Sequence, residues 1–165
     1  MLVRYPSRLN AGLVYPEPVG TVDITPTLLG LAGIRSAAPF EGRDLASRLG
    51  AESKTSEPEV IFLRNSGKSA QWLAAVDARY KLVLSVSDRP WLFDSEADPD
   101  ELLNFYGRPG TADVTRRLAV ALEGYAEKSG DPHVGHARIA ESLKLCLGQG
   151  AENSAGQGSG VKREL

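Results

Sequence analysis

The stretch Trp91-Leu92-Phe93-Asp94-Ser95-Glu96-Ala97-Asp98-Pro99-Asp100-Glu101-Leu102-Leu103-Asn104 is the most informative part of this sequence. Its three leading apolar residues predict a short strand, which the acidic run then ends. We expect Asp98 to cap a helical turn with Pro99 at its first position, where the missing N–H is not needed. Glu101, three residues after the cap, is placed to bond back to the N–H of Asp98. The acidic side chains are therefore interpreted as caps and turn formers.

Short strands are predicted on the N-terminal side of this stretch. Val60 to Leu63 is a brief apolar run. Trp72 to Val76 and Arg79 to Val86 flank Asp77-Ala78, an arrangement that suggests a hairpin. Within Arg79 to Val86 every second residue is apolar, and this period of two indicates a strand with one buried face. A small sheet with short connections is the expected result.

Helical patterns lie on both sides of the strands. Val22 to Ala32 has a broad apolar face, and Gly33 is a natural stop. Its candidate N-terminal caps are Thr21, Asp23 and Thr25. Asp113 to Lys128 carries apolar residues at spacings of three and four, with Thr111 as a cap, and Ala137 to Leu147 repeats the pattern over a shorter length.

The remaining segments carry weaker signals. Met1 to Tyr5 predicts a short apolar strand, which Pro6 ends. The region from residue 35 to 58 is rich in loop residues, with one turn of helix expected at Asp44 to Leu49. From Gly148 onward glycine, serine, glutamine and asparagine dominate, so we expect a disordered tail over 148–165.

Bulk composition excludes several classes of function. The chain has 165 residues, 42% of them hydrophobic and 24% charged, with a net charge of −2. This balance favours neither nucleic acid nor an anionic membrane as a partner. No apolar run approaches the ~18 residues of a membrane span. The single cysteine, Cys146, excludes an intramolecular disulfide and a cysteine-based metal cluster. Neither a signal peptide nor any other targeting signal is apparent at the N-terminus, so the cellular compartment is left open.

Four segments, taken in order, resemble the C-terminal part of the sulfatase family, in the arylsulfatase and alkaline-phosphatase-like superfamily. The last is the acidic stretch quoted above, which is similar to the family's "L-[YF]-D-L" and "D-P-x-E-x-x-N". The resemblance covers about residues 1–130. The other three segments are Met1-Leu2-Val3-Arg4-Tyr5-Pro6, then Val22 to Ile34 with Gly42-Arg43-Asp44-Leu45, and Asp77-Ala78-Arg79-Tyr80-Lys81-Leu82.

The resemblance implies an α+β fold. A small antiparallel sheet would pack against a C-terminal helix, preceded by a strand–helix piece of an α/β alkaline-phosphatase-like core. We expect residues 1–50 to form that strand–helix end of the catalytic domain and 51–130 to form the sulfatase C-terminal subdomain. Residues 131–147 are expected to add a helix, and 148–165 the tail.

The resemblance also implies the hydrolysis of sulfuric esters. Family members use a formylglycine, made from Cys or Ser in "C/S-x-P-S/A-R", and a calcium ion held by an early "D-D" and a later "D-[HN]" pair. None of these patterns occurs in the 165 residues. We therefore expect no catalytic residue, no metal ligand and no cofactor in this chain, and no activity by the chain alone.

Two interpretations follow from this mismatch. In the first, the chain is a sulfatase fragment that meets a sulfate ester only in an intact parent, either because Met1 is an internal methionine taken as a start codon or because the gene is split or truncated. In the second, the chain is a stand-alone, non-catalytic module that binds sulfated ligands or complements a catalytic partner. Association with a separate catalytic half belongs to the second interpretation, as one of its two possible roles. An upstream sequence that encodes the formylglycine motif in frame would favour the first.

Arg64, Asn65, Lys68 and Trp72 are the predicted substrate-binding residues. They surround a strand end and its loop, where polar and aromatic side chains can meet an anionic or sugar-like ligand. The alternative is an ordinary loop beside one packed tryptophan.

Asp131, His133 and His136 form the other cluster of interest. Histidines three residues apart can share a helix face and bind a metal ion, although no further histidine or cysteine lies nearby. The alternative, which we favour, is a pair of solvent-exposed histidines.

Overall fold

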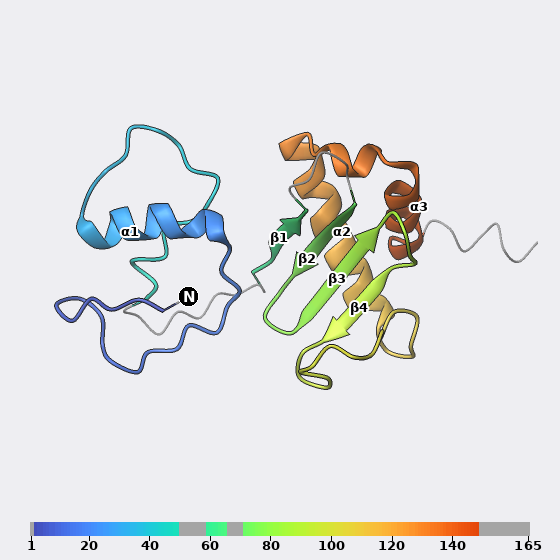
Figure 1. The fold of residues 1–165 in the computed structure, drawn as a ribbon, viewed down its shortest axis with the longest axis horizontal. Coiled ribbons are helices and arrows are strands. Elements are labelled where there is room, and N and C mark those ends of the chain that lie inside the picture. Colours follow the sequence, from blue (N-terminus) through green and yellow to red (C-terminus); the bar gives the residue numbers. More distant parts are fainter. Residues whose placement is uncertain (1, 50–58, 66–70, 149–165) are drawn as a thin grey trace, which may run out of the picture. The chain divides into compact units, whose positions relative to one another are not determined.

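The computed structural model of the chain describes residues 2–49, 59–65 and 71–148. The chain divides into two compact units (Figure 1). The N-terminal unit contains Met1–Leu63 and Val76–Ala78, and the C-terminal unit contains Arg64–Ala75 and Arg79–Leu165. None of the helices in the described ranges combines the length and the apolar character that a membrane crossing requires.

Four short strands form one sheet in the order in which they occur along the chain. They are β1 (Ile61–Arg64), β2 (Trp72–Val76), β3 (Tyr80–Ser85) and β4 (Trp91–Asp94). β3 and β4 are antiparallel, with Leu82 opposite Leu92. This order is a succession of hairpins, as the short connections predicted. The expected α+β class, with a small antiparallel sheet against a C-terminal helix, is confirmed.

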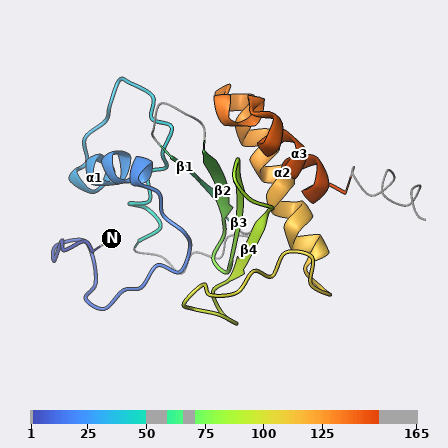
Figure 2. The ribbon, with the colours of Figure 1, turned by 45° about the vertical axis from the view of Figure 1, so that its right-hand side comes forward.

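Two helices cover one face of the sheet (Figures 1 and 2). They are α2 (Ala112–Ser129) and α3 (Ala137–Cys146), which contact each other and β3. The predicted period of two in β3 places alternate leucines against the helices, where burial of each side chain contributes about 2 kcal/mol. The central side chains are fully buried, and they are Leu82, Leu84, Leu92, Leu118, Leu122 and Ile139.

The start of α2 differs from the expected cap. Thr111 occupies the N-cap position, as predicted, but its side chain accepts no hydrogen bond from the helix. The hydroxyl instead donates to the carbonyl oxygens of Phe105, at 3.1 Å, and Arg108, at 2.8 Å. The two carbonyls lie in the preceding loop, so this side chain orders the loop that leads into the helix.

Asp94 ends β4 and forms the turn that follows. Its carboxylate accepts two hydrogen bonds from the Arg79 guanidinium, at 2.9 and 2.7 Å, and others from the N–H groups of Glu96 and Ala97. The hydrogen bonds from Arg79, followed by those from the turn, hold the pKa of Asp94 below its usual value, although burial opposes them. The interpretation of Asp94 as a turn former agrees with these contacts.

The predicted capping box at Asp98 is wrong. Asp98 to Glu101 forms a single turn, in which the N–H of Glu101 donates to the Asp98 carbonyl at 3.0 Å. Glu101 has a φ of 54°, in the left-handed region, and its carboxylate pairs with Lys81 of β3. A residue in this conformation ends a helical turn. The Glu101 side chain pairs with the distant Lys81 and not with the N–H of Asp98. The Asp98 carboxylate accepts from the N–H of Leu103 at 2.7 Å, so it does stabilise the loop.

Asn104 fastens this loop to the outer edge of β4. Its Oδ1 accepts from the N–H groups of Leu92, at 3.0 Å, and Tyr106, at 2.9 Å, while its Nδ2 donates to the Pro90 carbonyl at 3.0 Å. The N–H of Phe105 then donates to the Leu92 carbonyl at 2.8 Å. The asparagine and its neighbour thus satisfy backbone groups that an edge strand would otherwise expose.

The N-terminal unit is built around α1 (Ile24–Ala32), which follows the short helix η1 (Thr21–Asp23). The predicted helix is confirmed, as is its stop at Gly33, which has a φ of 72°. The buried Asp23 does not cap α1. Its carboxylate accepts from the backbone N–H of Gly20, at 3.0 Å, and from the N–H of Arg43, at 2.7 Å. Burial acts to raise the pKa of Asp23, but these two hydrogen bonds and the Arg43 guanidinium outweigh it, so the pKa is lowered.

Two glycines allow the chain around Arg43 to cross closely over α1 and η1. A Cβ at Gly42 would lie 1.9 Å from the backbone oxygen of Val22, and one at Gly30 would lie 2.2 Å from Asp44 Oδ2. Thr27 of α1 holds the crossing segment, since its hydroxyl contacts the Arg43 carbonyl and the Leu45 N–H at 3.3 and 3.1 Å. Glycine is therefore required for space at position 42, where the neighbour is backbone, whereas a side chain at position 30 would require the Asp44 side chain to move.

The strand expected at Met1 to Tyr5 is not formed. Residues 2–5 belong to no helix or strand in the structure. A strand needs a neighbour to accept and donate its backbone hydrogen bonds, and the described part of the chain provides none for this segment. The single turn expected at Asp44 to Leu49 is confirmed, because the N–H groups of Arg48 and Leu49 both donate to the Leu45 carbonyl. Apart from Gly148, the predicted tail lies outside the described residues.

Candidate functional site

The predicted substrate-binding residues lie at one end of β1 and β2. Arg64 is the last residue of β1, Asn65 follows it, and the half-buried Trp72 begins β2. The side-chain oxygen of Asn65 accepts from the backbone N–H groups of Gln71, at 2.9 Å, and Trp72, at 3.1 Å. Asn65 thus joins the two strand ends. Lys68, the fourth predicted residue, lies outside the described residues.

The connection between α2 and α3 contributes two further side chains to this end of the sheet. Asp131 precedes the short helix η2 (Pro132–Gly135) and caps it by accepting from the N–H of His133 at 2.9 Å. His133 Nδ1 lies 2.7 Å from Asp131 Oδ1, and its Nε2 lies 2.9 Å from Asn65 Oδ1. Arg64 completes the group, with a guanidinium nitrogen 3.4 Å from Asp131 Oδ2. We call these four residues the Asp131 cluster.

The Asp131 cluster is buried on one side and open on the other. The side chain of Asp131 is 1% exposed, whereas that of Arg64 is 50% exposed. Burial acts to raise the pKa of Asp131, but hydrogen bonds from His133 and the charge of Arg64 outweigh it and lower the pKa. The carboxylate is therefore ionised at neutral pH. Its Oδ2 accepts no hydrogen bond from the described residues, and Arg64 provides the nearby positive charge.

The sequence did not indicate that Asp131 and His133 lie at the end of β1, beside Arg64 and Asn65. The expectation that both histidines are exposed is confirmed for His136 and wrong for His133, which is only 4% exposed. The buried ring has a polar partner at each nitrogen, Asp131 at Nδ1 and Asn65 at Nε2. A local signal existed, since Asp131-Pro132 directly after Gly130 is a typical start for a new helix. Its partner, Asn65, could not be identified from such a local pattern.

The metal interpretation gains no support from the geometry. Within the described ranges, no group of three or more His, Cys, Asp or Glu side chains is arranged to hold an ion. In the Asp131 cluster the lone carboxylate already faces a guanidinium, which would repel a cation. The described residues therefore do not fit the calcium ion that the family resemblance implies, and the sequence has no motif for formylglycine.

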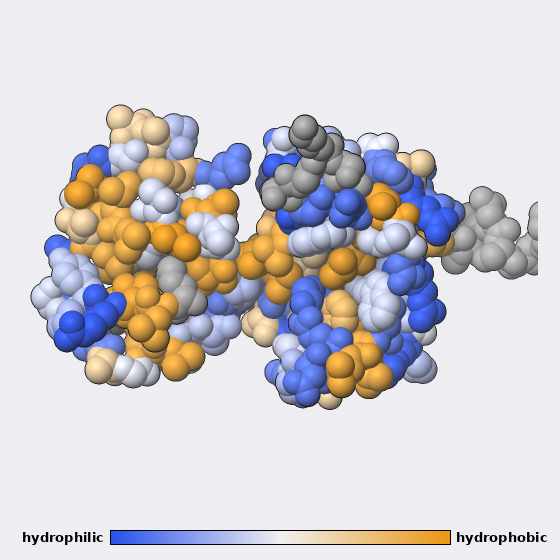
Figure 3. Space-filling view, in the orientation of Figure 1, coloured by the Kyte–Doolittle hydropathy of each residue, from blue (hydrophilic) through white to orange (hydrophobic). Residues whose placement is uncertain are grey.

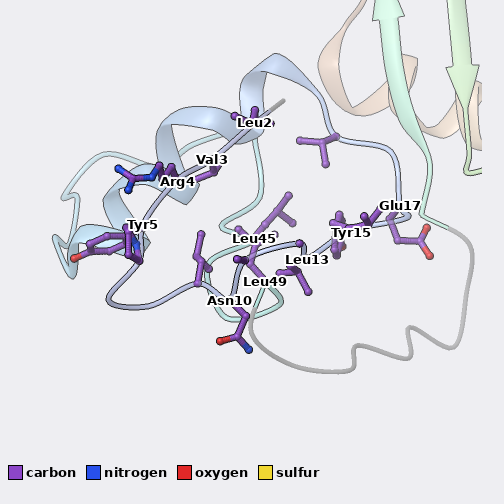
Figure 4. Close-up of a pocket in the computed structure, with 16 residues that line it drawn as sticks. Leu2, Val3, Arg4, Tyr5, Asn10, Leu13, Tyr15, Glu17, Leu45 and Leu49 are labelled. Atoms are coloured by element: carbon purple, nitrogen blue, oxygen red, sulfur yellow. The ribbon is translucent and has the colours of Figure 1, made fainter.

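The N-terminal unit contains an open apolar cleft of about 1040 Å³. Figure 4 shows its lining, with Leu13, Leu45 and Leu49 drawn together near its centre. Several lining side chains face solvent, since Leu2 is 96% exposed, Leu13 49% and Val14 83%. Figure 3 shows that apolar residues occupy much of one face of this unit. Larger exposed apolar patches on proteins are found at interaction sites, in ligand-binding grooves and at surfaces prone to aggregation.

Comparison with known protein families gives a match over most of the chain. Residues 1–128 match the family model described as "N-sulphoglucosamine sulphohydrolase, C-terminal". The matched range includes the N-terminal unit and the whole sheet, and it ends within α2.

Individual relatives are also sulfatases by name. The chain is 24% identical over 136 residues to the ulvan-active sulfatase of Formosa agariphila, covering 79% of this chain and 27% of that protein. It is 34% identical over 95 residues to the choline-sulfatase of Rhizobium meliloti, covering 56% and 18%. The chain thus spans about a quarter or less of the length of these curated relatives.

The fold is shared with solved structures. One of them, solved in complex with its substrate D-glucosamine-2-N,6-O-disulfate, superposes with a TM-score of 0.62 at 23% identity, covering 79% of this chain and 28% of that one. The family match, the shared fold and the order of the four motifs agree. This chain belongs to the sulfatases, in the family of N-sulphoglucosamine sulphohydrolase C-terminal regions.

Proposed function

We propose that this chain is the C-terminal part of a sulfuric ester hydrolase and that it is inactive without a catalytic half. The observation that carries the proposal is the apolar cleft of the N-terminal unit. Its exposed side chains, Leu2 and Val14 above all, are of the kind that stable proteins bury against another surface. A catalytic domain that supplies a neighbouring strand would cover the cleft and provide backbone partners for residues 2–5.

A buried carboxylate oxygen in the cleft supports the same partner. Glu17 lines the cleft, and its Oε2 is buried without a hydrogen-bond partner among the described residues. An acceptor buried without a donor costs about 1–3 kcal/mol, so such an atom is usually paired in the functional state. A donor from a catalytic half, either a backbone N–H or a basic side chain, would satisfy it.

The Asp131 cluster supports a role in substrate recognition. In the proposal, Arg64, Asn65, Lys68 and Trp72 form part of the wall that meets a sulfated sugar. The oxygen of Asn65 accepts from two backbone N–H groups and also lies 2.9 Å from His133 Nε2, so its role would be to hold the strand ends in place. Arg64 is half exposed and keeps a planar guanidinium available, a group that binds oxyanions well. A sulfated glucosamine is the substrate class of the similar structure described above, and we propose a sulfated sugar for this chain.

The first test is a hydrolysis assay. We expect the purified 165-residue chain to release no sulfate from an aryl sulfate, with or without added calcium, because its sequence has no formylglycine motif and its described residues include no group of side chains arranged to hold an ion. A preparation of an intact sulfatase, assayed in parallel, controls for the substrate and the buffer. Release of sulfate by the chain, after removal of host enzymes, would refute the proposal that it is inactive alone.

The second test addresses the cleft. We expect the chain to enhance the fluorescence of a hydrophobic dye, and Val14→Asp to reduce this enhancement by roughly half, because it places a charge in the exposed apolar surface. Val120→Asp is the matched control, since Val120 is 53% exposed on α2 and does not line the cleft. Equal dye binding by both variants would show that the cleft is not an accessible apolar surface.

A stand-alone binding module is the second candidate function. The position of the Asp131 cluster favours it, because all four residues belong to the C-terminal unit and need no group from a catalytic half. In that case the isolated chain would bind sulfated sugars and would not bind the dye. The dye measurement therefore separates the two candidates.

A further inference from the structure

The hydrogen bonds of His133 define its protonation state. A neutral imidazole has one N–H donor and one acceptor nitrogen, and only the imidazolium donates from both. His133 Nδ1 faces the Asp131 carboxylate at 2.7 Å, and an ionised carboxylate can only accept. Nδ1 therefore carries a proton. The state of the ring then depends on what Nε2 faces.

The partner of Nε2 is the amide of Asn65, whose orientation is fixed by its other contacts. Asn65 Oδ1 accepts from the backbone N–H groups of Gln71 and Trp72, at 2.9 and 3.1 Å. Rotating the amide by half a turn would place its NH₂ against these two donors and lose both bonds. The atom 2.9 Å from Nε2 is thus an acceptor, and Nε2 must also carry a proton.

We infer that His133 is a buried imidazolium that positions Asn65 and Asp131, and that it leaves the Asp131 cluster with an excess of one positive charge. With both ring nitrogens of His133 protonated, as the inference requires, the cluster contains two cations, His133 and Arg64, and one carboxylate. Asp131 cannot neutralise both. The imidazolium is buried and donates two hydrogen bonds. The positive charge that Asp131 does not neutralise is therefore accessible to a ligand at the half-exposed Arg64.

This charge distribution deepens the proposed function, on which it rests. A site with one excess positive charge and an accessible guanidinium favours an oxyanion, and in a sulfatase the relevant group is the sulfate of a sugar. His133 does not touch that ligand. It acts as a positioning residue by sustaining the charge of Arg64 and by holding the ends of β1 and β2 in place through Asn65.

The test of the inference is an NMR measurement on the full chain labelled with ¹⁵N in its histidines. The chain has two, His133 and His136. At pH 7 we expect both ring nitrogens of His133 to show a directly bonded hydrogen. His136 is the internal control, because its Nδ1 accepts from the Arg138 N–H at 3.3 Å and no carboxylate among the described residues pairs with its ring. An unprotonated ring nitrogen in His133 overturns the inference.

A sulfate titration separates this inference from the proposed function. With ionic strength held constant by sodium chloride, sodium sulfate is expected to shift the resonances of residues 64 and 65. His133→Gln keeps one donor but removes the charge, and we expect it to weaken sulfate binding roughly five-fold. Arg64→Gln is expected to abolish binding.

The two failures can be told apart. If sulfate binds through Arg64 while His133→Gln binds as tightly as the parent, the positioning role is wrong and the proposed recognition of a sulfate stands. If the ring of His133 is doubly protonated and no sulfate binds, the role of Arg64 in recognition is wrong. The spectrum of the parent chain needs no substitution, so the protonation state can be tested even if a variant fails to fold.

Discussion

Substitution of Gly42 by alanine is expected to disrupt the N-terminal unit, at a cost of about 3 kcal/mol or more. The added Cβ would lie 1.9 Å from the backbone oxygen of Val22 and 2.7 Å from the backbone nitrogen of Asp23. Both are main-chain atoms, so no side chain can rotate to make room. We expect α1 to separate from the crossing segment, and its amide hydrogens to exchange with solvent at least 100-fold faster, the factor that corresponds to this free energy.

Gly20→Ala is the matched control for this prediction. Gly20 lies in the same unit with a φ of −88°, which alanine adopts readily, and its nearest neighbour would be 3.5 Å from the new Cβ. We expect exchange in α1 to change little in this variant. Exchange in Gly42→Ala at the rate of the parent chain would show that the segment can move aside, and would contradict the argument from close approach.

Replacement of Asn104 by alanine is expected to destabilise the C-terminal unit by about 2–4 kcal/mol. The change removes three hydrogen bonds at once and leaves the N–H of Leu92 without its partner at the edge of β4. Urea unfolding followed by tryptophan fluorescence measures the loss, because Trp91 lies in the same strand.

Two further variants divide the contribution of Asn104. Asn104→Asp keeps the acceptor for Leu92 and Tyr106 but loses the donor to Pro90, so we expect a smaller loss than with alanine. Asp100→Ala alters an exposed residue of the same loop and should change the free energy of unfolding by less than about 0.5 kcal/mol. If the three variants unfold at the same urea concentration, Asn104 does not stabilise the edge.

Local patterns in the sequence predicted the elements of the fold well. The alternation in β3 and the spacing of three and four residues in α2 identified the sides that carry the buried Leu82 and Leu118. Such patterns record how one segment meets an apolar layer, and they do not depend on which other segment supplies it. The order of four motifs added the family, which the match over residues 1–128 confirms.

The sequence predicted poorly where a side chain has a distant partner. Glu101 was expected to bond to Asp98, three residues away, but it pairs with Lys81, twenty residues away. His133 was expected in solvent, but it contacts Asn65, which lies 68 residues earlier. Residues 2–5 have an apolar pattern typical of a strand and form none, because a strand also depends on its neighbour.

The hydrogen bonds of Asn104 and Phe105 with the edge of β4 have a consequence for self-association. A chain with an open sheet edge can recruit another copy strand by strand and grow into a fibre. In this protein the amide and carbonyl of Leu92 are already engaged, so such growth is blocked at its midpoint. The loop that identifies the family in sequence therefore also protects the β4 edge of the sheet from strand addition, and loss of Asn104 would make aggregation through this edge a risk beyond its cost in stability.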